Sequence, residues 1–305
     1  MPSEKTALHE RIESGQPLLL AEISPPVGSD PAPLRRVAQR FAGKVHALGL
    51  SDNQDRVRMS ALAAAALVAA QGVEPILHMT TRDRNRIALI SDGLGAQALG
   101  IRNLLCTSGT HQTLGRYRAA KNVFDLDSIH LLQVLFDLAG DGSLVGEEGI
   151  EGAGPFCLGG TAAPYADPLE LQVLRLAKKV LAGAHFVVTQ PIFDLERFAA
   201  WWQEVTRRGL HEKVAVVAGI RPLADARQAA DYAAKRPLPC VPQAILERLA
   251  AQSGPSAQRA AGIEIARETI GRLSSVGGLR GFEISCDGDA AAALELLDKC
   301  QLGVN

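Results

Sequence analysis

The stretch "LLLAEISPPVGSDP", residues 18–31, combines an apolar run, a carboxylate inside that run and two prolines that end it. The run from Leu18 is typical of a buried β-strand, and Pro25 and Pro26 stop it because proline lacks the backbone donor of a strand. A glutamate in a buried strand is unfavourable unless it is paired or lies at the exposed strand end. Glu22 is therefore expected at a strand end where its carboxyl group is used.

The same succession of a short apolar run and a longer helical segment recurs along the chain. It predicts eight strands, at residues 18–24, 45–50, 75–80, 102–107, 155–161, 185–190, 214–219 and 281–285. Helices are predicted at residues 31–41, 55–71, 83–99, 125–138, 168–182, 194–208 and 289–300, most of them starting at Asp or Pro. Eight βα units in 305 residues favour a (β/α)₈ TIM barrel, an α/β fold, over an open doubly wound sheet.

The pattern predicts a single barrel domain over residues 1–305, with residues 1–15 as an N-terminal extension or helix. Length and composition alone also allow two smaller domains. Two extra helices, at 242–251 and 256–274, precede the last strand and are interpreted as insertions on the barrel. No P-loop is present and no GxGxxG follows the first strand, so the main sequence support for a dinucleotide-binding sheet is missing.

Charge and composition favour a small-molecule partner. The formal net charge is −1 and no long run of one sign occurs, so neither a nucleic-acid groove nor a membrane-binding face is expected. The N-terminus lacks the apolar stretch of a secretory signal, and the longest apolar run, Ala61–Ala70, is too short to cross a bilayer. Five scattered cysteines without a CxxC pair fit a reducing cytoplasm, and no metal site is expected.

Polar side chains follow nearly every predicted strand. In a barrel the C-terminal strand ends converge on one face, where ligands bind. These residues are Glu22, Ser24, Ser51, Asp52, Asn53, Gln54, His78, Thr80, Thr81, Arg82, Thr107, Ser108, Thr110, His111, Thr161, Gln190 and Arg221. Each alone has a structural explanation, such as capping the next helix. Their convergence from six or more strands predicts a binding site, with Glu22 and Gln190 carrying the most weight.

A set of motifs carries a family resemblance. They are AEISPP (21–26), LSDNQ (50–54), HMTTRDRN (78–85), GIRNLLCTSG (100–109), GGTAAPYADP (159–168), KKVLAGAHFVVTQPIFD (178–194), VVAGIRPL (216–223) and GFEIS (281–285). Together they resemble the methylenetetrahydrofolate reductases, flavin-dependent barrel enzymes of one-carbon metabolism, from about residue 16 to residue 302. The length resembles the short bacterial and acetogen-type catalytic domain, without the eukaryotic regulatory domain.

The resemblance implies reduction of the methylene bridge of 5,10-methylenetetrahydrofolate to the methyl group of 5-methyltetrahydrofolate, by hydride from a reduced flavin. Glu22 matches the general acid that protonates the departing amine when the imidazolidine ring opens, and burial raises a carboxyl pKa in the direction this role needs. Gln190 matches the glutamine that binds the pterin, and Arg221 is a further expected substrate contact.

The resemblance also implies a flavin site, for FAD in preference to FMN. The expected cofactor-binding residues are Ser51, Asn53, His78, Thr80, Arg82, Asp83, Ser108, Gly109, His111, Ala162, Ala163 and Lys179. For the arginine-rich turn at 82–86, phosphate contact and a solvated helix face are both open interpretations.

One departure from the family pattern concerns the reaction itself. Thr110 stands where the family usually carries an aspartate, whose charge is expected to stabilise the cationic folate intermediate. Ala163 stands where an aromatic residue is common. Thr110 is counted with Glu22 among the catalytic candidates. Three interpretations stay open: a reductase with a retuned flavin and another electron donor, a reductase of a related pterin substrate, or a protein that binds its ligand without turnover.

The electron donor and the partners are also open. NADH, NADPH and a reduced iron–sulfur partner subunit are alternative donors, because the family recognises nicotinamide without a glycine-rich motif. From a different class of protein, a folate-binding subunit that has lost its chemistry is an alternative. A homo-oligomer is compatible with the sequence.

Overall fold

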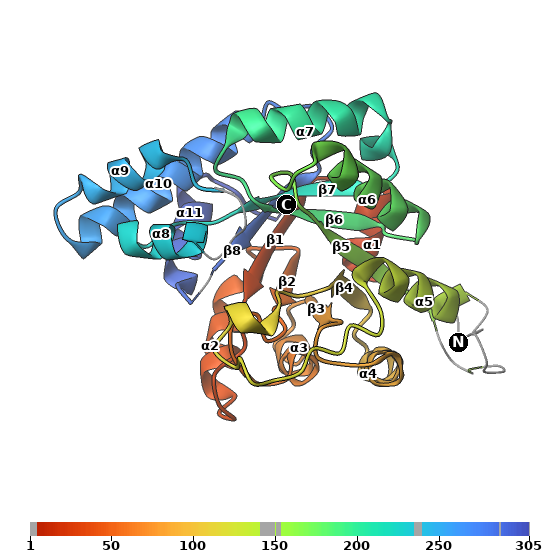
Figure 1. Ribbon diagram of the computed structural model, residues 1–305. Helices are drawn as coiled ribbons and strands as arrows, with labels where there is room; N and C mark the ends of the chain where they lie inside the picture. The colour runs from red at the N-terminus through yellow and green to blue at the C-terminus, as the bar shows by residue number, and fades with distance from the viewer. Residues whose placement is uncertain (1–4, 141–149, 151–153, 235–239, 287, 305) are drawn as a thin grey trace.

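The computed structural model describes residues 5–140, 150, 154–234, 240–286 and 288–304. Eight parallel strands follow one another around a closed barrel, and the last pairs with the first (Figure 1). They are β1 (Leu18–Ile23), β2 (Ala47–Leu50), β3 (Pro75–Thr80), β4 (Asn103–Thr107), β5 (Cys157–Ala162), β6 (Phe186–Pro191), β7 (Ala215–Ile220) and β8 (Gly281–Ser285). The predicted (β/α)₈ barrel is confirmed, with every strand within two residues of its expected limits.

The helices surround the barrel (Figure 1). They are α1 (Ala7–Glu13), α2 (Ala32–Phe41), α3 (Ala61–Ala69), α4 (Arg86–Ala98), α5 (Ser128–Gly140), α6 (Leu169–Leu181), α7 (Leu195–Arg207), α8 (Ala226–Ala234), α9 (Gln243–Ala250), α10 (Pro255–Leu273) and α11 (Ala290–Lys299). The predicted helices at 242–251 and 256–274 are α9 and α10. However, α10 packs against β7 and α11, so it is the outer helix of the seventh unit and not an insertion. The added elements are α8, which the sequence pattern did not predict, and α9.

One predicted helix, at 55–71, begins only at Ala61. The Asp55 carboxylate accepts a hydrogen bond from the Arg58 guanidinium at 3.2 Å, and the same guanidinium donates to the carbonyl oxygen of Pro25 at 3.0 Å. The side-chain oxygen of Asn53 accepts from the backbone N–H of Arg58 at 2.9 Å. These contacts hold residues 53–58 as a loop against the end of β1. A helical turn at these positions would move them away from β1.

The barrel interior is apolar toward the N-terminal ends of the strands. The buried side chains that fill it are Leu18, Leu20, Ala47, Ile76, Leu105, Cys157, Phe186, Val188, Ala215 and Val217, and Leu8 and Ile12 of α1 pack against them. Toward the C-terminal ends the inward positions become polar, with Glu22 on β1, Thr80 on β3 and Thr161 on β5. The apolar filling therefore supports the polar mouth from below.

A substitution of Gly159 on β5 tests this packing of the barrel interior. A Cβ atom at this position would lie 2.2 Å from the Phe186 ring, closer than real Cβ contacts allow. Gly159→Ala is expected to lower the free energy of unfolding by about 1–3 kcal/mol, measured by urea denaturation. Gly271→Ala is the control, because no described atom apart from its chain neighbours and its own helix backbone lies within 4 Å of its Cβ position on α10. The control should raise stability by roughly 0.5–1 kcal/mol, whereas an unchanged Gly159→Ala protein would contradict the packing.

Candidate active site

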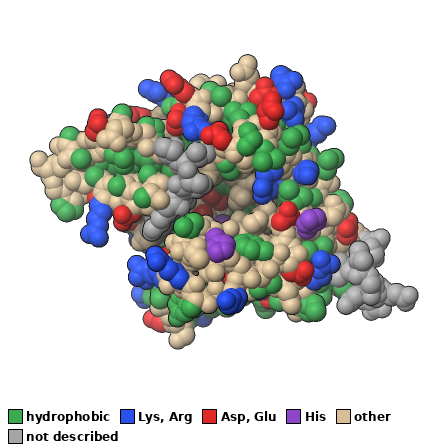
Figure 2. Space-filling model, in the orientation of Figure 1, with side chains coloured by type: hydrophobic (Ala, Val, Ile, Leu, Met, Phe, Trp, Pro, Cys, Tyr) green, Lys and Arg blue, Asp and Glu red, His purple; other side chains and the backbone are tan. Residues whose placement is uncertain are grey.

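A cavity of about 700 Å³ opens at the C-terminal ends of the strands, and residues at the ends of all eight strands contribute to its lining. Figure 2 shows it as a hollow between the side of the molecule that carries α7 to α10 and the side that carries α2 to α4. Most of the residues predicted for the site lie on its wall: Glu22, His78, Thr80, Arg82, Ser108, Gly109, Thr110, Ala162, Ala163, Lys179, Gln190 and Arg221. The convergence expected from the sequence is therefore present.

Four residues predicted to bind a cofactor lie outside this lining and make contacts within the loops. The Ser51 hydroxyl donates to the Ser24 hydroxyl at 3.0 Å. Asn53 holds the 53–58 loop, and Asp83 accepts hydrogen bonds from Arg82. The His111 ring accepts from the backbone N–H of Thr113 at 3.4 Å. Contact of Ser51, Asn53, Asp83 and His111 with a cofactor stays a prediction.

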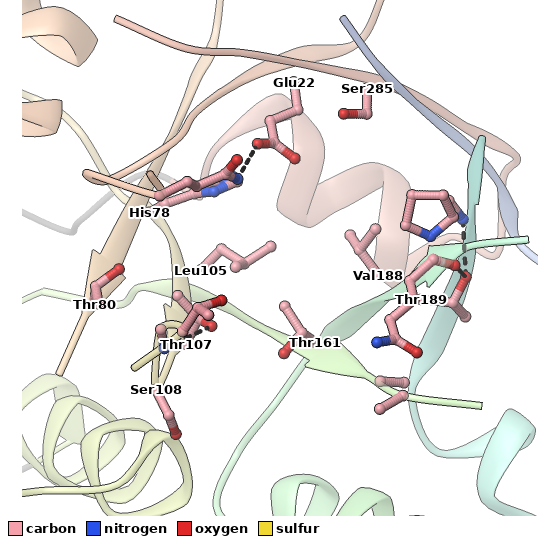
Figure 3. A pocket seen from close by; sticks show the side chains of 18 of the residues that line it. Glu22, His78, Thr80, Leu105, Thr107, Ser108, Thr161, Val188, Thr189 and Ser285 are labelled. Carbon is pink, nitrogen blue, oxygen red and sulfur yellow. Dashed lines mark hydrogen bonds between the residues drawn. The ribbon is translucent and has the colours of Figure 1, made fainter. Parts of the chain in front are cut away.

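Glu22 lies at the end of β1 with its carboxyl group in the cavity (Figure 3). The amide nitrogen of Gln54 donates to its Oε1 at 2.6 Å. Burial raises the pKa of Glu22, and the hydrogen bond from Gln54 and the positive charge of Arg221 offset this only in part. A carboxyl group with a raised pKa keeps its proton closer to neutral pH, which is the property of a general acid.

A second carboxyl group, that of Glu283 on β8, lines the same cavity. The side chain is only 5% exposed, and its Oε1 has no hydrogen-bond partner among the described residues. Burial and the nearby charge of Glu22 raise the pKa of Glu283 well above its ordinary value. Glu283 is not among the residues predicted from the sequence, although GFEIS shows the same signal as LLLAEIS, a glutamate inside an apolar strand.

His78 lies inside the barrel on β3, with its Nε2 unpartnered among the described residues. Burial lowers the pKa of His78 to about 4, so the ring is neutral near pH 7. Gly49 on β2 makes room for the ring, because a Cβ atom there would lie 2.7 Å from Nε2. His78 can therefore offer a neutral donor or acceptor but no charge.

The arginine-rich turn is engaged in ion pairs. Arg82 donates to Asp83 at 2.6 Å and to the carbonyl oxygen of Thr110 at 2.9 Å. Arg84 pairs with Asp52 and also with Asp92, the latter at 2.6 Å. The charges of Arg82 and Arg84 are thus largely compensated by aspartates, and the turn joins the loops after β2, β3 and β4. Arg82 is buried and so does not belong to a solvated helix face, whereas contact of this turn with a phosphate stays a prediction.

Positive charge reaches the cavity from α6. Lys179 is 5% exposed, and its ammonium group donates to the carbonyl oxygen of Thr161. Burial and then the charge of Arg175 lower the pKa of Lys179 to about 8. Arg175 lies one turn earlier on the same helix and also lines the cavity. The wall beside β5 therefore suits a negatively charged part of a ligand.

The remaining predicted residues surround the opening. The side-chain Oε1 of Gln190 is buried without a hydrogen-bond partner among the described residues. The Arg221 guanidinium lies 4.3 Å from the centre of the Tyr232 ring. Tyr232 belongs to α8, so the helix that the sequence did not predict contributes to the wall. Thr110 is exposed at the rim, and its backbone oxygen receives the hydrogen bond from Arg82.

Two further properties concern the part of the chain that the structure describes. Its His, Cys, Asp and Glu side chains form no group of three or more suited to holding a metal ion. None of its helices combines the length and apolar character needed to cross a bilayer.

Comparison with known proteins shows which family the chain resembles. Residues 7–300 match the family described as methylenetetrahydrofolate reductase. A curated relative from Caenorhabditis elegans, named "Probable methylenetetrahydrofolate reductase (NADPH)", is 27% identical over 235 residues, which is 73% of this chain and 33% of the relative. The chain thus spans about a third of that relative's length.

A solved structure from Clostridium thermocellum shares the fold, with a TM-score of 0.65 and 13% identity over 96% of this chain and 98% of the other. It is described as an uncharacterized protein that binds two copies of 5-methyl-5,6,7,8-tetrahydrofolic acid. The family match covers the barrel and every strand end that forms the cavity. The chain therefore belongs to the methylenetetrahydrofolate reductase family.

Proposed function

We propose that the protein reduces the methylene bridge of 5,10-methylenetetrahydrofolate to a methyl group in the cavity at the barrel mouth. The observation that carries this proposal is the placement of Glu22, a carboxyl group with a raised pKa, in a large cavity of a chain from this family. The folate described for the Clostridium thermocellum structure supports the substrate class. The name of the C. elegans relative supports a reductase that uses NADPH.

The chain's own residues supply the proton and the orientation. Glu22 gives its proton to the departing amine, so the carbon–nitrogen bond of the five-membered ring breaks and an iminium cation remains on the folate. The Gln54 amide, which donates to Oε1 of Glu22, then stabilises the carboxylate that is left. Hydride addition to the iminium carbon completes the methyl group. One hydride and one proton are consumed in each turnover.

Gln190 is the proposed pterin contact. An amide side chain offers one acceptor and two donors, which match the alternating donors and acceptors along the edge of a pterin ring. The buried Oε1 without a partner among the described residues would be satisfied by a ligand N–H. Arg221 is proposed as a further substrate contact, and its position over Tyr232 limits the directions in which its guanidinium can point.

The residues present fit a flavin in two respects. Ala162, Ala163 and Gly109 add no bulky side chain to the wall beyond β4 and β5, so a flat ring system has space beside them. Lys179 and Arg175 bring positive charge to the same wall for a phosphate or a reduced ring. A bound reduced flavin would supply the hydride. FAD is proposed in preference to FMN, with NADPH, NADH or a reduced iron–sulfur partner as the source of electrons.

The test begins with the absorption spectrum of the purified protein, which is expected to show a flavin band. Anaerobic turnover with methylenetetrahydrofolate then compares NADPH, NADH and an artificial donor. Formation of methyltetrahydrofolate with any donor supports the proposal, and turnover only with the artificial donor indicates a partner protein. A colourless protein that forms no methyltetrahydrofolate, even with added flavin, would contradict it and favour a binding subunit.

Thr110 gives a separate prediction. Its hydroxyl lies at the exposed rim, where the family's aspartate would place a negative charge near the folate cation. Thr110→Asp is expected to change the flavin reduction potential or the rate of folate turnover, because a carboxylate stabilises a nearby cation and opposes a nearby anion. Potentiometric titration and steady-state kinetics measure the two effects. No change in either would exclude Thr110 from the reacting site.

A further inference from the structure

Glu283 is a buried carboxyl group that has no role in the proposed reaction. In the pairing of β1 with β8 it is opposite Leu20, whose side chain belongs to the apolar filling of the barrel, so Glu283 also points inward. Its side chain lines the cavity, is only 5% exposed and has an Oε1 without a hydrogen-bond partner among the described residues. A buried polar atom without a partner costs free energy. We therefore expect a ligand in the cavity to bond to it.

A bulge in β6 and a glycine in β7 shape the wall beside Glu283. In the pairing of β7 with β8, Glu283 is opposite Gly219. Gly219 is in turn opposite Pro191 of β6, and the register of β6 against β7 shifts between Val188 and Pro191. A Cβ atom on Gly219 would lie 2.4 Å from the carbonyl oxygen of Thr189, which is too close for a real Cβ atom. The β6 backbone thus lies where a β7 side chain would be, an approach that glycine permits.

Gln190 is part of this bulge and lines the same cavity as Glu283. A Cβ atom on Gly219 would lie 3.1 Å from the carbonyl carbon and oxygen of Gln190, so the Gln190 backbone adjoins the glycine. The side-chain Oε1 of Gln190 is buried and has no partner among the described residues either. Because only β7 lies between β6 and β8, their backbones are roughly 10 Å apart. Two unpartnered side-chain oxygens therefore line the cavity from the two sides of Gly219.

The titratable and charged groups around Glu283 come from several elements. They are Glu22 on β1, Asp52 after β2, His78 on β3, Lys179 on α6, Arg221 after β7 and Cys286 after β8. His78 is neutral near pH 7, and burial raises the pKa of the Cys286 thiol, which is neutral as well. Asp52 pairs with Arg84, and the positive charge of Arg221 acts on Glu22. The ammonium group of Lys179 donates to the carbonyl oxygen of Thr161.

These surroundings favour the protonated form of Glu283. Burial, and then the charge of Glu22, raise the pKa of Glu283 well above its ordinary value. Neither a cation nor a hydrogen bond from the described residues offsets these two effects. A buried carboxylate without such a partner is unfavourable, whereas the protonated group is neutral. Glu283 can therefore offer a ligand one O–H donor and one C=O acceptor side by side.

We propose that Glu283 is a substrate contact whose protonated carboxyl group, beside Gln190, binds the lactam edge of the pterin ring. This inference rests on the proposed function for the identity of the ligand. The lactam of a pterin carries an N–H donor next to a C=O acceptor, so it pairs with a protonated carboxyl group through two parallel hydrogen bonds. The pairing is neutral and leaves no buried charge. The wall proposed for the flavin lies beyond β4 and β5, across the barrel from β8, which leaves the side of β8 to the pterin.

Two variants of Glu283 test the contact, with 5-methyltetrahydrofolate as the ligand and anaerobic isothermal titration calorimetry near pH 7 as the measurement. Glu283→Gln has the donor and the acceptor of a protonated carboxyl group but cannot ionise, so its Kd is expected within about threefold of wild type. Glu283→Leu has neither group, so its Kd is expected to rise by about 10- to 100-fold. Wild-type affinity in Glu283→Leu would overturn the contact. Equal losses in both variants would overturn the protonated form, because an ionised carboxylate would then be needed.

Glu74→Gln is the control for the loss of a carboxylate, because Glu74 lies at the opposite end of the barrel, outside the described cavity lining. Its Oε1 accepts from the backbone N–H of Leu8 at 3.0 Å and from the Asn103 amide at 2.8 Å. This variant is expected to bind methyltetrahydrofolate as the wild-type protein does.

The pH dependence of binding is a second test, which needs only the wild-type protein and Glu283→Gln. The O–H donor is present below the raised pKa of Glu283 and is lost above it. The ratio of wild-type affinity to Glu283→Gln affinity is therefore expected to stay constant below that pKa and to fall above it, by about tenfold. Ionisation of the ligand or of Glu22 affects both proteins and cancels in the ratio. A ratio that rises with pH would overturn the protonated contact, even if Glu283→Leu does not fold.

Both tests measure binding without turnover, so they separate this contact from the proposed function. If the expected affinities are found but no folate is reduced, the proposed reduction fails and the contact stands. If folate is reduced and both Glu283 variants bind as the wild-type protein does, the contact fails and the proposed function stands. A wild-type protein that binds no methyltetrahydrofolate would overturn the contact outright.

Discussion

Glu22→Gln is expected to reduce folate turnover by about 10²- to 10⁴-fold, the range that a positioned general acid contributes. Glutamine keeps the size and polarity of the side chain but has no proton that it can give to the departing amine. Flavin binding and flavin reduction should be retained, since Glu22 is not among the residues proposed to hold the cofactor. Steady-state formation of methyltetrahydrofolate and anaerobic flavin reduction measure the two properties separately.

The control for this prediction is Glu74→Gln, whose carboxylate lies at the base of the barrel and accepts hydrogen bonds from the backbone N–H of Leu8 and the amide of Asn103. It should turn over folate at the wild-type rate. Folate turnover by Glu22→Gln within a fewfold of wild type would exclude Glu22 as the acid. In that case Glu283, the other carboxyl group on the cavity wall, would be the next candidate.

Gln190→Leu is expected to raise KM for the folate by about 10- to 100-fold, with a smaller change in kcat. The reason is that the leucine offers no partner to the polar edge of the pterin, which would then be buried without its hydrogen bonds. Initial rates over a range of folate concentrations give both constants. Gln39→Leu is the control, because Gln39 is exposed on α2, outside the cavity lining. An unchanged KM in Gln190→Leu would remove Gln190 from the substrate contacts.

The barrel was predictable from the sequence because its strand signals are local. Each strand is a short apolar run of the kind in LLLAEI, and its neighbours along the chain are also its neighbours in the barrel. Helix starts were less predictable, as in the 53–58 loop. There Asp55 resembles a helix cap, but the hydrogen bond from Arg58 to Pro25 joins residues 33 positions apart in the sequence. Such long-range hydrogen bonds leave no local pattern.

Whereas Lys179 on α6 was expected from the family resemblance, the sequence pattern predicted site residues only at strand ends. Glu22 and Gln190 were found in this way, and both line the cavity. Glu283 lies two residues before the end of β8, and the strand-end residues predicted from the sequence include none from this strand. Tyr232 reaches the wall from α8, a helix between β7 and β8 whose sequence, ARQAADYAA, has no large aliphatic side chain to mark its apolar face. The ion pairs of Arg82 and Arg84 depend on how three loops meet.

The most direct test of the proposed function is a single anaerobic turnover of the chemically reduced protein. Reduced protein is mixed with methylenetetrahydrofolate in the absence of any other donor, and methyltetrahydrofolate and flavin absorbance are followed together. We expect one methyltetrahydrofolate per bound flavin, formed at the rate at which the oxidised flavin absorbance returns. Bound folate that stays unreduced, with the flavin remaining in its reduced form, would contradict the proposal that this cavity is a folate reductase site.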